Sequence, residues 1–315
     1  MPQPPGARSG VYGAAGLAVA AMVSVQTGAA VSTWMFPVAG PLGTASLRLA
    51  FAAVILLVWA RPRLRGRSRS DLLVAGAFGV ISAVMTLSYF AAIDRIPLGV
   101  SSALEFLGPL AVAVFGLRRR RDVVWPLLAL GGVLALTQPW NGSLDPVGLA
   151  FGVLSGAALG GYVIFSQRVG DRFSGVDGLA FAVTVAALCT APFGLVHAVP
   201  VLTPGMLLGA AGAAVLLPVL PYVLEMMALR RLTTGALGTL LSFEPGFAAL
   251  IGFLLLHQSL TVAQLAGLVC VVAASLGAVR GGERKPQEQD RMEAEAESER
   301  ETEPETGVAQ QPVRS

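Results

Sequence analysis

The sequence has 315 residues, of which 54% are hydrophobic and only 13% are charged. A soluble globular domain carries about 25% charged residues, so this composition excludes an ordinary soluble domain and places the chain among membrane proteins. The net charge is +3, and the basic residues stand in short loops between apolar segments. This distribution marks membrane orientation, and no nucleic-acid partner is expected.

Ten apolar segments are predicted to be membrane-spanning helices, because a helix needs roughly 20 apolar residues to cross the hydrocarbon core. The first is interrupted by serine, threonine and glutamine side chains between residues 24 and 33, which is typical of a helix that faces a watery cavity. A cleaved signal peptide is the alternative for this segment, but its apolar run is too long for one. In chain order the segments are 12–36, 43–60, 72–93, 97–116, 123–138, 147–167, 177–197, 205–228, 233–254 and 259–279.

The placement of arginine predicts the orientation of these segments, because cytoplasmic loops carry the excess of Lys and Arg. Every even-numbered loop is basic, whereas the loops between them contain only Arg95. Both termini are therefore expected in the cytoplasm. The arginines of the even-numbered loops are Arg61, Arg63, Arg65, Arg67, Arg69, Arg118, Arg119, Arg120, Arg121, Arg168, Arg172, Arg230 and Arg231.

The chain contains an internal repeat. Residues 92–112 align with 228–248 without gaps, and both stretches cover the third-to-fourth helix connection of a five-helix half. Five is odd, so the second half enters the membrane from the opposite side. Inverted repeats of this kind are common in secondary transporters, with the substrate near the midplane. The predicted domains are two five-helix repeats, 1–142 and 143–282, followed by a charged cytoplasmic tail, 283–315, whose composition predicts disorder.

Ionisable residues inside the predicted helices are few. In residues 1–282 the only glutamates are Glu105, Glu225 and Glu244, all within apolar segments, and Arg48 is the one basic residue well inside a helix. A charge at the bilayer centre costs about 2.5–3.5 kcal/mol on insertion scales. Such residues therefore face a cavity, pair with one another or carry protons. An Arg48–glutamate pair that locks the bundle is the structural alternative to a transport role.

Two of these glutamates stand beside prolines. Pro109 follows Glu105 by four residues, and Pro245 directly follows Glu244. A proline inside a helix kinks it and frees a carbonyl one turn upstream. The pattern predicts kinked helices whose carboxylates and carbonyl oxygens face a cavity and suit an ammonium group.

Several stretches resemble the EamA-type transporters of the drug/metabolite transporter superfamily, in the threonine and homoserine exporter branch. They are "QTGAAVS" (26–32), "FPVAGPLGTASLRLA" (36–50), "IPLGVSSALEF" (96–106), "LEFLGPLAVAVF" (104–115) and "LPYVLEMMALRRLTTGALGTLLSFEPGFAALIG" (220–252). The resemblance implies an all-α membrane protein of ten helices in two inverted halves, and export of small neutral amino acids. The residues expected to bind substrate are Arg48, Glu105, Glu244, Glu225, Gln26 and Tyr222.

The sequence thus predicts a secondary transporter of the cell membrane that exports threonine-like or homoserine-like amino acids by alternating access, coupled to protons. Glu105 and Glu244 are the rival carriers of the proton. No catalytic residue set, metal site or cofactor is expected, so the chain is not expected to be an enzyme. The expected partners are the amino-acid substrate, protons and the lipid bilayer, with a homo-oligomer left open. Efflux of other metabolites or toxic amino-acid analogues is the alternative, ahead of a membrane-embedded enzyme or a sensor.

Overall fold

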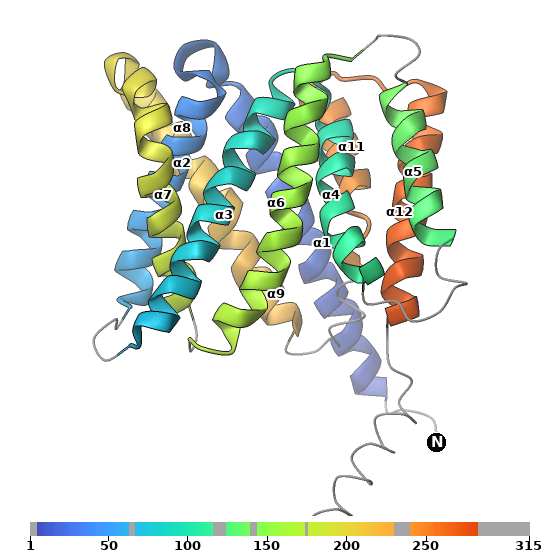
Figure 1. Ribbon diagram of the computed structural model, residues 1–315, viewed down its shortest axis with the longest axis horizontal. Helices are drawn as coiled ribbons and strands as arrows, with labels where there is room; N and C mark the ends of the chain where they lie inside the picture. Colours follow the sequence, from blue (N-terminus) through green and yellow to red (C-terminus); the bar gives the residue numbers. More distant parts are fainter. Residues whose placement is uncertain are drawn as a thin grey trace, which may run out of the picture. The chain divides into compact units, whose positions relative to one another are not determined.

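A computed structural model describes residues 5–62, 67–115, 124–138, 144–173, 176–229 and 240–282, and these residues form helices and turns without any strand. The predicted all-α class is therefore confirmed. Residues up to Gly281 form one compact unit, in which the helices run side by side (Figure 1). The predicted boundary between the two repeats, at 142–143, and the predicted tail lie outside the described residues.

The described helices fall within or across all ten predicted segments, although several of their bounds differ from the prediction. They are α1 (Pro5–Thr33), α2 (Phe36–Ala60), α3 (Arg69–Ile93), α4 (Leu98–Phe115), α5 (Val124–Thr137), α6 (Pro146–Gly170), α7 (Asp177–Ala198), the 3₁₀ turn η3 (Val199–Val201), α8 (Pro204–Ala214), the π-helical turn η4 (Val215–Val219), α9 (Leu220–Leu229), α11 (Glu244–Leu256) and α12 (Val262–Gly282).

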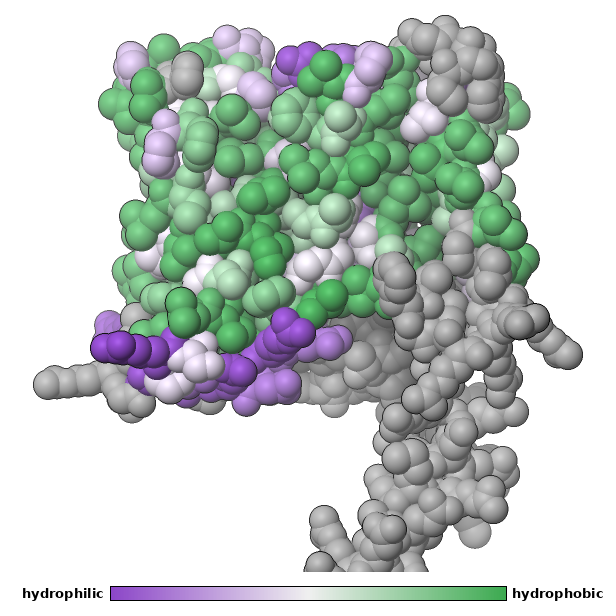
Figure 2. All heavy atoms as spheres, in the orientation of Figure 1, coloured by the Kyte–Doolittle hydropathy of each residue, from purple (hydrophilic) through white to green (hydrophobic). Residues whose placement is uncertain are grey.

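The outer surface of the bundle is apolar. Within the described ranges, six helices are long and apolar enough to cross a membrane, and shorter apolar helices accompany them. Leu208 and Val262 are 75% and 86% exposed, which suits hydrocarbon rather than water. Figure 2 shows the resulting band of apolar side chains between two hydrophilic margins. This surface is that of a multi-pass membrane protein.

Helix α2 begins at Phe36, seven residues before the predicted segment. Pro37 stands in its first turn, and Gly40 interrupts the helix with φ 69° and ψ 166°, a backbone conformation that favours glycine. The predicted start at 43 missed this kinked first portion. In the predicted segment Arg48 would lie toward the outer end of the helix, whereas the longer α2 places it near the middle.

The eighth predicted segment is not one continuous helix. Between α8 and α9, the η4 turn contains Leu217 in an extended conformation, with φ −154° and ψ 111°. Pro218 follows it, and a proline disfavours helical geometry in the preceding residue and donates no N–H. The break leaves two carbonyl oxygens for other partners. Ser24 Oγ donates to that of Leu216 at 2.8 Å, and Arg48 Nη1 to that of Leu217 at 2.9 Å.

The two prolines beside glutamates occupy different positions. Pro109 lies inside α4, where it removes the N–H that would bond to the carbonyl of Glu105. Pro245 lies in the first turn of α11, after a turn at Ser242 and Phe243. That position tolerates proline, because its N–H has no intrahelical partner. The second proline therefore marks a helix start rather than a kink within a continuous helix.

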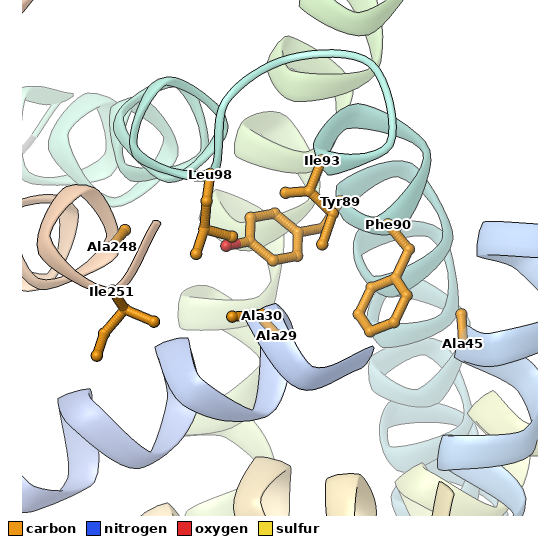
Figure 3. Packing of buried hydrophobic residues seen from close by; sticks show 9 residues of the cluster. All are labelled: Ala29, Ala30, Ala45, Tyr89, Phe90, Ile93, Leu98, Ala248 and Ile251. Carbon is orange, nitrogen blue, oxygen red and sulfur yellow. The ribbon is translucent and has the colours of Figure 1, made fainter. Parts of the chain in front are cut away.

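Small residues and one aromatic cluster set the spacing of the helices. An added Cβ at Gly156 of α6 would lie 2.6 Å from the carbonyl oxygen of Leu104 in α4, so only glycine permits this approach of the two backbones. Beside it, Tyr89 and Phe90 of α3 pack with small and aliphatic residues of α1, α2, α4 and α11 (Figure 3). Tyr89 and Phe90 of this cluster also line a cavity in the centre of the bundle.

Candidate functional site

A cavity of about 490 Å³ lies in the centre of the bundle, lined by α1, α2, α3, α4, α6, α7, η4, α9, α11 and α12. Pro109 is also part of its wall, whereas Pro245 is buried directly beside Glu244. The structure therefore brings residues from both halves of the chain around one space. All the predicted substrate-binding residues line it, namely Gln26, Arg48, Glu105, Tyr222, Glu225 and Glu244.

Arg48 is the only basic side chain in the described lining of this cavity. It is 2% exposed, its Nη1 donates to the carbonyl of Leu217, and its guanidinium carbon lies 4.9 Å from the ring centroid of Phe90. Its Nε is buried and has no hydrogen-bond partner. An uncompensated charge buried in this way is costly, and a planar guanidinium is well suited to a carboxylate.

The ion pairs among the described residues join Arg95 to Asp145 and Arg172 to Asp71. Neither involves Arg48, so the bundle-locking pair between Arg48 and a glutamate is not formed in this structure. The guanidinium and the carboxylates of the cavity instead face a shared space without direct ion pairing.

Glu105 reaches the cavity from α4. Ser155 of α6 donates a hydrogen bond to its Oε1 at 2.6 Å. The carbonyl of Glu105 lacks an intrahelical donor because Pro109 stands four residues later. Glu105 thus places a carboxylate at the wall of the cavity, one turn from a proline.

Glu244 enters from the first turn of α11 and is held by Gln26 of α1. The Nε2 of Gln26 donates to Glu244 Oε1 at 3.1 Å, and the Oε1 of the same amide accepts from the Tyr89 hydroxyl at 3.4 Å. Gln26 is 1% exposed. It therefore acts as a buried bridge between a carboxylate and a phenol.

Glu225 and Tyr222 lie three residues apart on α9, which follows the break at η4, and both line the same cavity. Glu225 is partly exposed, with no hydrogen bond to the described part of the chain. Apolar side chains, among them Leu159 and Val163 of α6 and Leu179 of α7, complete this portion of the wall. Glu225 and the Tyr222 hydroxyl are therefore the polar groups of an otherwise apolar portion of the wall.

Sequence reasoning missed three features of the site. Ser155 holds Glu105, Tyr89 bonds to Gln26, and the carbonyl of Leu217 accepts from Arg48. The position of Ser155 beside Gly156 in a glycine-rich helix, and the two closely spaced prolines Pro218 and Pro221, were the available signals. The described residues contain no group of three or more His, Cys, Asp or Glu side chains that could hold a metal ion.

An apolar helical bundle with charged side chains around a central cavity, and with a broken helix beside it, is typical of secondary transporters. The profile of the EamA-like transporter family matches residues 146–280. The chain is 37% identical over 271 residues to the threonine/homoserine exporter RhtA of Salmonella typhimurium LT2, covering 85% of this chain and 91% of that one. It is 38% identical over 263 residues to threonine/homoserine exporter RhtA of Escherichia coli K12, covering 82% and 88%.

The chain belongs to the EamA-like transporter family. It is a multi-pass membrane transporter and not an enzyme. A solved crystal structure also resembles it with a TM-score of 0.58 and 16% identity, covering 85% of this chain and 96% of that chain. At this identity the similarity bears on the fold alone.

Proposed function

We propose that this protein exports small neutral amino acids of the threonine and homoserine type across the cell membrane, in exchange for protons. The observation that carries the proposal is the central cavity, where a buried guanidinium with an unbonded Nε and three carboxyl groups surround one space. An amino acid is a zwitterion, so its two charges complement this arrangement. The two exporters to which the chain is 37% and 38% identical carry the same substrate class in their names.

Arg48 would bind the substrate carboxylate. The carbonyl of Leu217 and the ring of Phe90 hold the guanidinium in place, while its Nε has no other partner. Arg and carboxylate form bidentate pairs, with two parallel N–H···O bonds. A carboxylate that approaches the Nε side of Arg48 would satisfy this orphaned donor.

The ammonium group would lie against Glu105 or Glu244. Both line the cavity. Ser155 donates one hydrogen bond to Glu105 and Gln26 donates one to Glu244, which leaves further acceptor sites on each carboxylate for a ligand. The rest of the wall is mostly apolar. The charged lining would bind the carboxylate and ammonium groups of the substrate, and the apolar lining would contact a small uncharged side chain.

The proposal includes ten membrane crossings in two inverted five-helix repeats, residues 1–142 and 143–282, with both termini cytoplasmic. The packing pattern supports it. Helix α3 packs on α6 as α9 packs on α1, α4 packs on α6 as α11 packs on α1, and α2 packs directly on α7. Exchange of the first, second, third and fourth helices between halves reproduces this pattern, as an approximate twofold axis would.

Alternating access would expose the cavity to one side of the membrane at a time. A carboxylate that holds either a proton or an ammonium group, but not both, would couple the opposite movements of the two. Four arginines of the basic loops and the adjoining helix ends are exposed, namely Arg61, Arg69, Arg168 and Arg172. Their placement supports a cytoplasmic position for that end of the bundle.

The experiment is uptake of labelled threonine and homoserine into inverted membrane vesicles that contain the full chain. Export in the cell corresponds to accumulation in the vesicle lumen, and an acidic lumen should drive it. A protonophore should abolish the accumulation, and the Arg48→Ala variant at the same membrane level serves as the matched control. No accumulation above that of vesicles without the protein would reject the proposal. Stronger competition by larger metabolites than by homoserine would favour the broader efflux function.

A further inference from the structure

Ser155 lies where three helices of the cavity wall meet. It is fully buried, at 0% exposure, and its neighbour Gly156 allows α6 to approach the backbone of Leu104 and Glu105 in α4. This close approach brings the Ser155 hydroxyl directly against the Glu105 carboxyl group. The carbonyl of Met85 in α3 lies on the other side of the same hydroxyl.

The hydroxyl of Ser155 has two acceptors within reach. Its Oγ lies 2.6 Å from Glu105 Oε1 and 3.3 Å from the carbonyl oxygen of Met85. A serine hydroxyl carries one proton and two lone pairs, so it can donate to only one of them at a time. The shorter distance falls in the range of about 2.5–2.7 Å that is usual for an O–H donor and a carboxylate.

We propose that Ser155 is the positioning residue that lets Glu105 exchange its proton during transport, an inference that rests on the proposed function. When Glu105 is ionised, the Ser155 hydroxyl donates to the carboxylate. When Glu105 takes up a proton, its own O–H donates to Ser155 Oγ, and the serine O–H turns to the Met85 carbonyl. Both states keep Glu105 hydrogen-bonded, and the change requires only the rotation of one O–H bond.

Glu244 has a different kind of partner. The Gln26 amide offers it an N–H donor, while the amide oxygen is occupied by the Tyr89 hydroxyl. An amide cannot exchange a donor for an acceptor by rotating a hydrogen. The whole Gln26 side-chain amide would have to turn over, and the Tyr89 hydroxyl would have to change from donor to acceptor. The hydrogen bonds therefore assign proton exchange to Glu105 and a fixed role to Glu244.

Other titratable and charged groups also face Glu105 across the cavity. These groups remain unchanged when only Ser155 is substituted, so a change in pH dependence in that variant reports on the hydroxyl. They are Arg48 from α2, Tyr89 from α3, Tyr162 from α6, Tyr222 and Glu225 from α9, and Glu244 from α11.

The test is the pH dependence of threonine export by Ser155→Ala, measured in vesicles that contain the full chain. The hydroxyl donates to a charged carboxylate in one state and accepts from a neutral carboxyl in the other, and the charged hydrogen bond is roughly twice as strong. Loss of both should therefore raise the pH of half-maximal export by roughly one unit. Ser155→Thr retains a hydroxyl and should restore the parent's midpoint. The matched control is Ser82→Ala, because Ser82 is also buried but bonds only to the carbonyl of Phe78 in its own helix.

Exchange of labelled for unlabelled threonine without a proton gradient gives a second readout. Ser155→Ala should reduce gradient-driven export more than it reduces this exchange, because only net export requires Glu105 to take up and release a proton. Should Ser155→Ala not reach the membrane, Ser155→Cys, with a weakly donating thiol, replaces it and should show a smaller shift. A parent-like pH profile in the alanine variant would overturn the role of Ser155 alone. Absence of threonine transport by the parent protein would instead overturn the proposed function.

Discussion

Arg48 and Arg95 show how the same side chain is treated in two regions of the bundle. Arg95, in the loop between α3 and α4, is 43% exposed and forms an ion pair with Asp145 at 2.8 Å. Arg48, at the centre, is 2% exposed, lacks a carboxylate partner and retains a buried Nε without a hydrogen bond. Arg95, which water could solvate, is paired with a carboxylate, whereas Arg48, which is buried, keeps an N–H donor without a partner.

The contrast extends to the neighbours of each arginine. At the end of the bundle that holds Arg95, the side chain of Gln258 accepts from the backbone N–H of Leu98 at 2.9 Å, and Gln138 donates to Thr261 at 3.1 Å. These contacts join the ends of α4 and α5 to the loop between α11 and α12. Around Arg48, by comparison, polar groups border a cavity. The polar groups near Arg95 are paired with one another and stabilise the fold, whereas the unpaired donor of Arg48 is available to a ligand.

The largest expected effect is at Arg48 itself, because its loss should impair both net export and labelled-for-unlabelled exchange. Arg48→Lys keeps the charge but not the planar fork, and Arg48→Ala removes both, so carboxylate binding should be lost in either case. The loss of charged hydrogen bonds worth about 1.5–3 kcal/mol predicts a decrease in export of roughly 10- to 150-fold, carried mainly by KM. Initial rates over a range of threonine concentrations, at matched protein levels in the membrane, provide the measurement. Parent-like transport by Arg48→Ala would remove this residue from the binding site.

The next effect separates the two hydrogen-bonded carboxylates of the same cavity. Glu105→Gln should abolish export driven by a proton gradient, because the amide cannot take up the proton, while labelled-for-unlabelled exchange should persist at a reduced rate. Glu244→Gln should weaken transport but keep the parent's dependence on pH. Measuring both variants at several pH values gives the comparison. If the Glu244 variant alone lost its pH dependence, the two assignments would have to be exchanged.

A smaller effect is expected at the break between α8 and α9. Pro218→Ala restores a backbone N–H and permits regular helix, which would draw the Leu217 carbonyl away from Arg48. Loss of that one charged hydrogen bond predicts a fall in export of about tenfold. Leu202, an exposed residue before α8, offers Leu202→Ala as a control outside the cavity. Unchanged export by Pro218→Ala would show that the break does not position the guanidinium.

The sequence was sufficient for the helical class and for the charged residues of the cavity, for a physical reason. A charge within an apolar run stands out, so Arg48, Glu105, Glu225 and Glu244 could all be named before the structure was known. Ser155 could not, because a serine in a helix most often bonds to its own backbone. Nor could the Leu217 carbonyl, because every residue carries a carbonyl and its availability depends on the local backbone conformation.

The start of α2 and the break in the eighth segment were missed for a related reason. Proline is compatible with a first turn, a kink or a complete interruption, and the surrounding packing decides among them. Pro37 and Pro245 lie in first turns, Pro109 lies within α4, and Pro218 lies in the break. The apolar pattern around these four prolines is similar, so it did not predict their different outcomes.

The smallest expected effect is at the paired arginine, and it is one of stability rather than transport. Arg95 and the backbone N–H of Val147 hold the pKa of Asp145 below its usual range, with the Arg95 hydrogen bond as the larger cause. A carboxyl group whose pKa is lowered in the folded state stabilises the fold above its ordinary pKa, and that contribution is lost as pH falls through the lowered value. Because the pair is exposed, its contribution is small.

Arg95→Gln should therefore lower Tm slightly at neutral pH, and the difference from the parent should vanish in acid, while export stays within about twofold of the parent. Thermal unfolding of the two proteins across this pH range is the measurement, and Asp145→Asn, which keeps an N-cap side chain for α6, is the matched control. A large loss of export in Arg95→Gln at full stability would place the paired arginine in the transport mechanism as well.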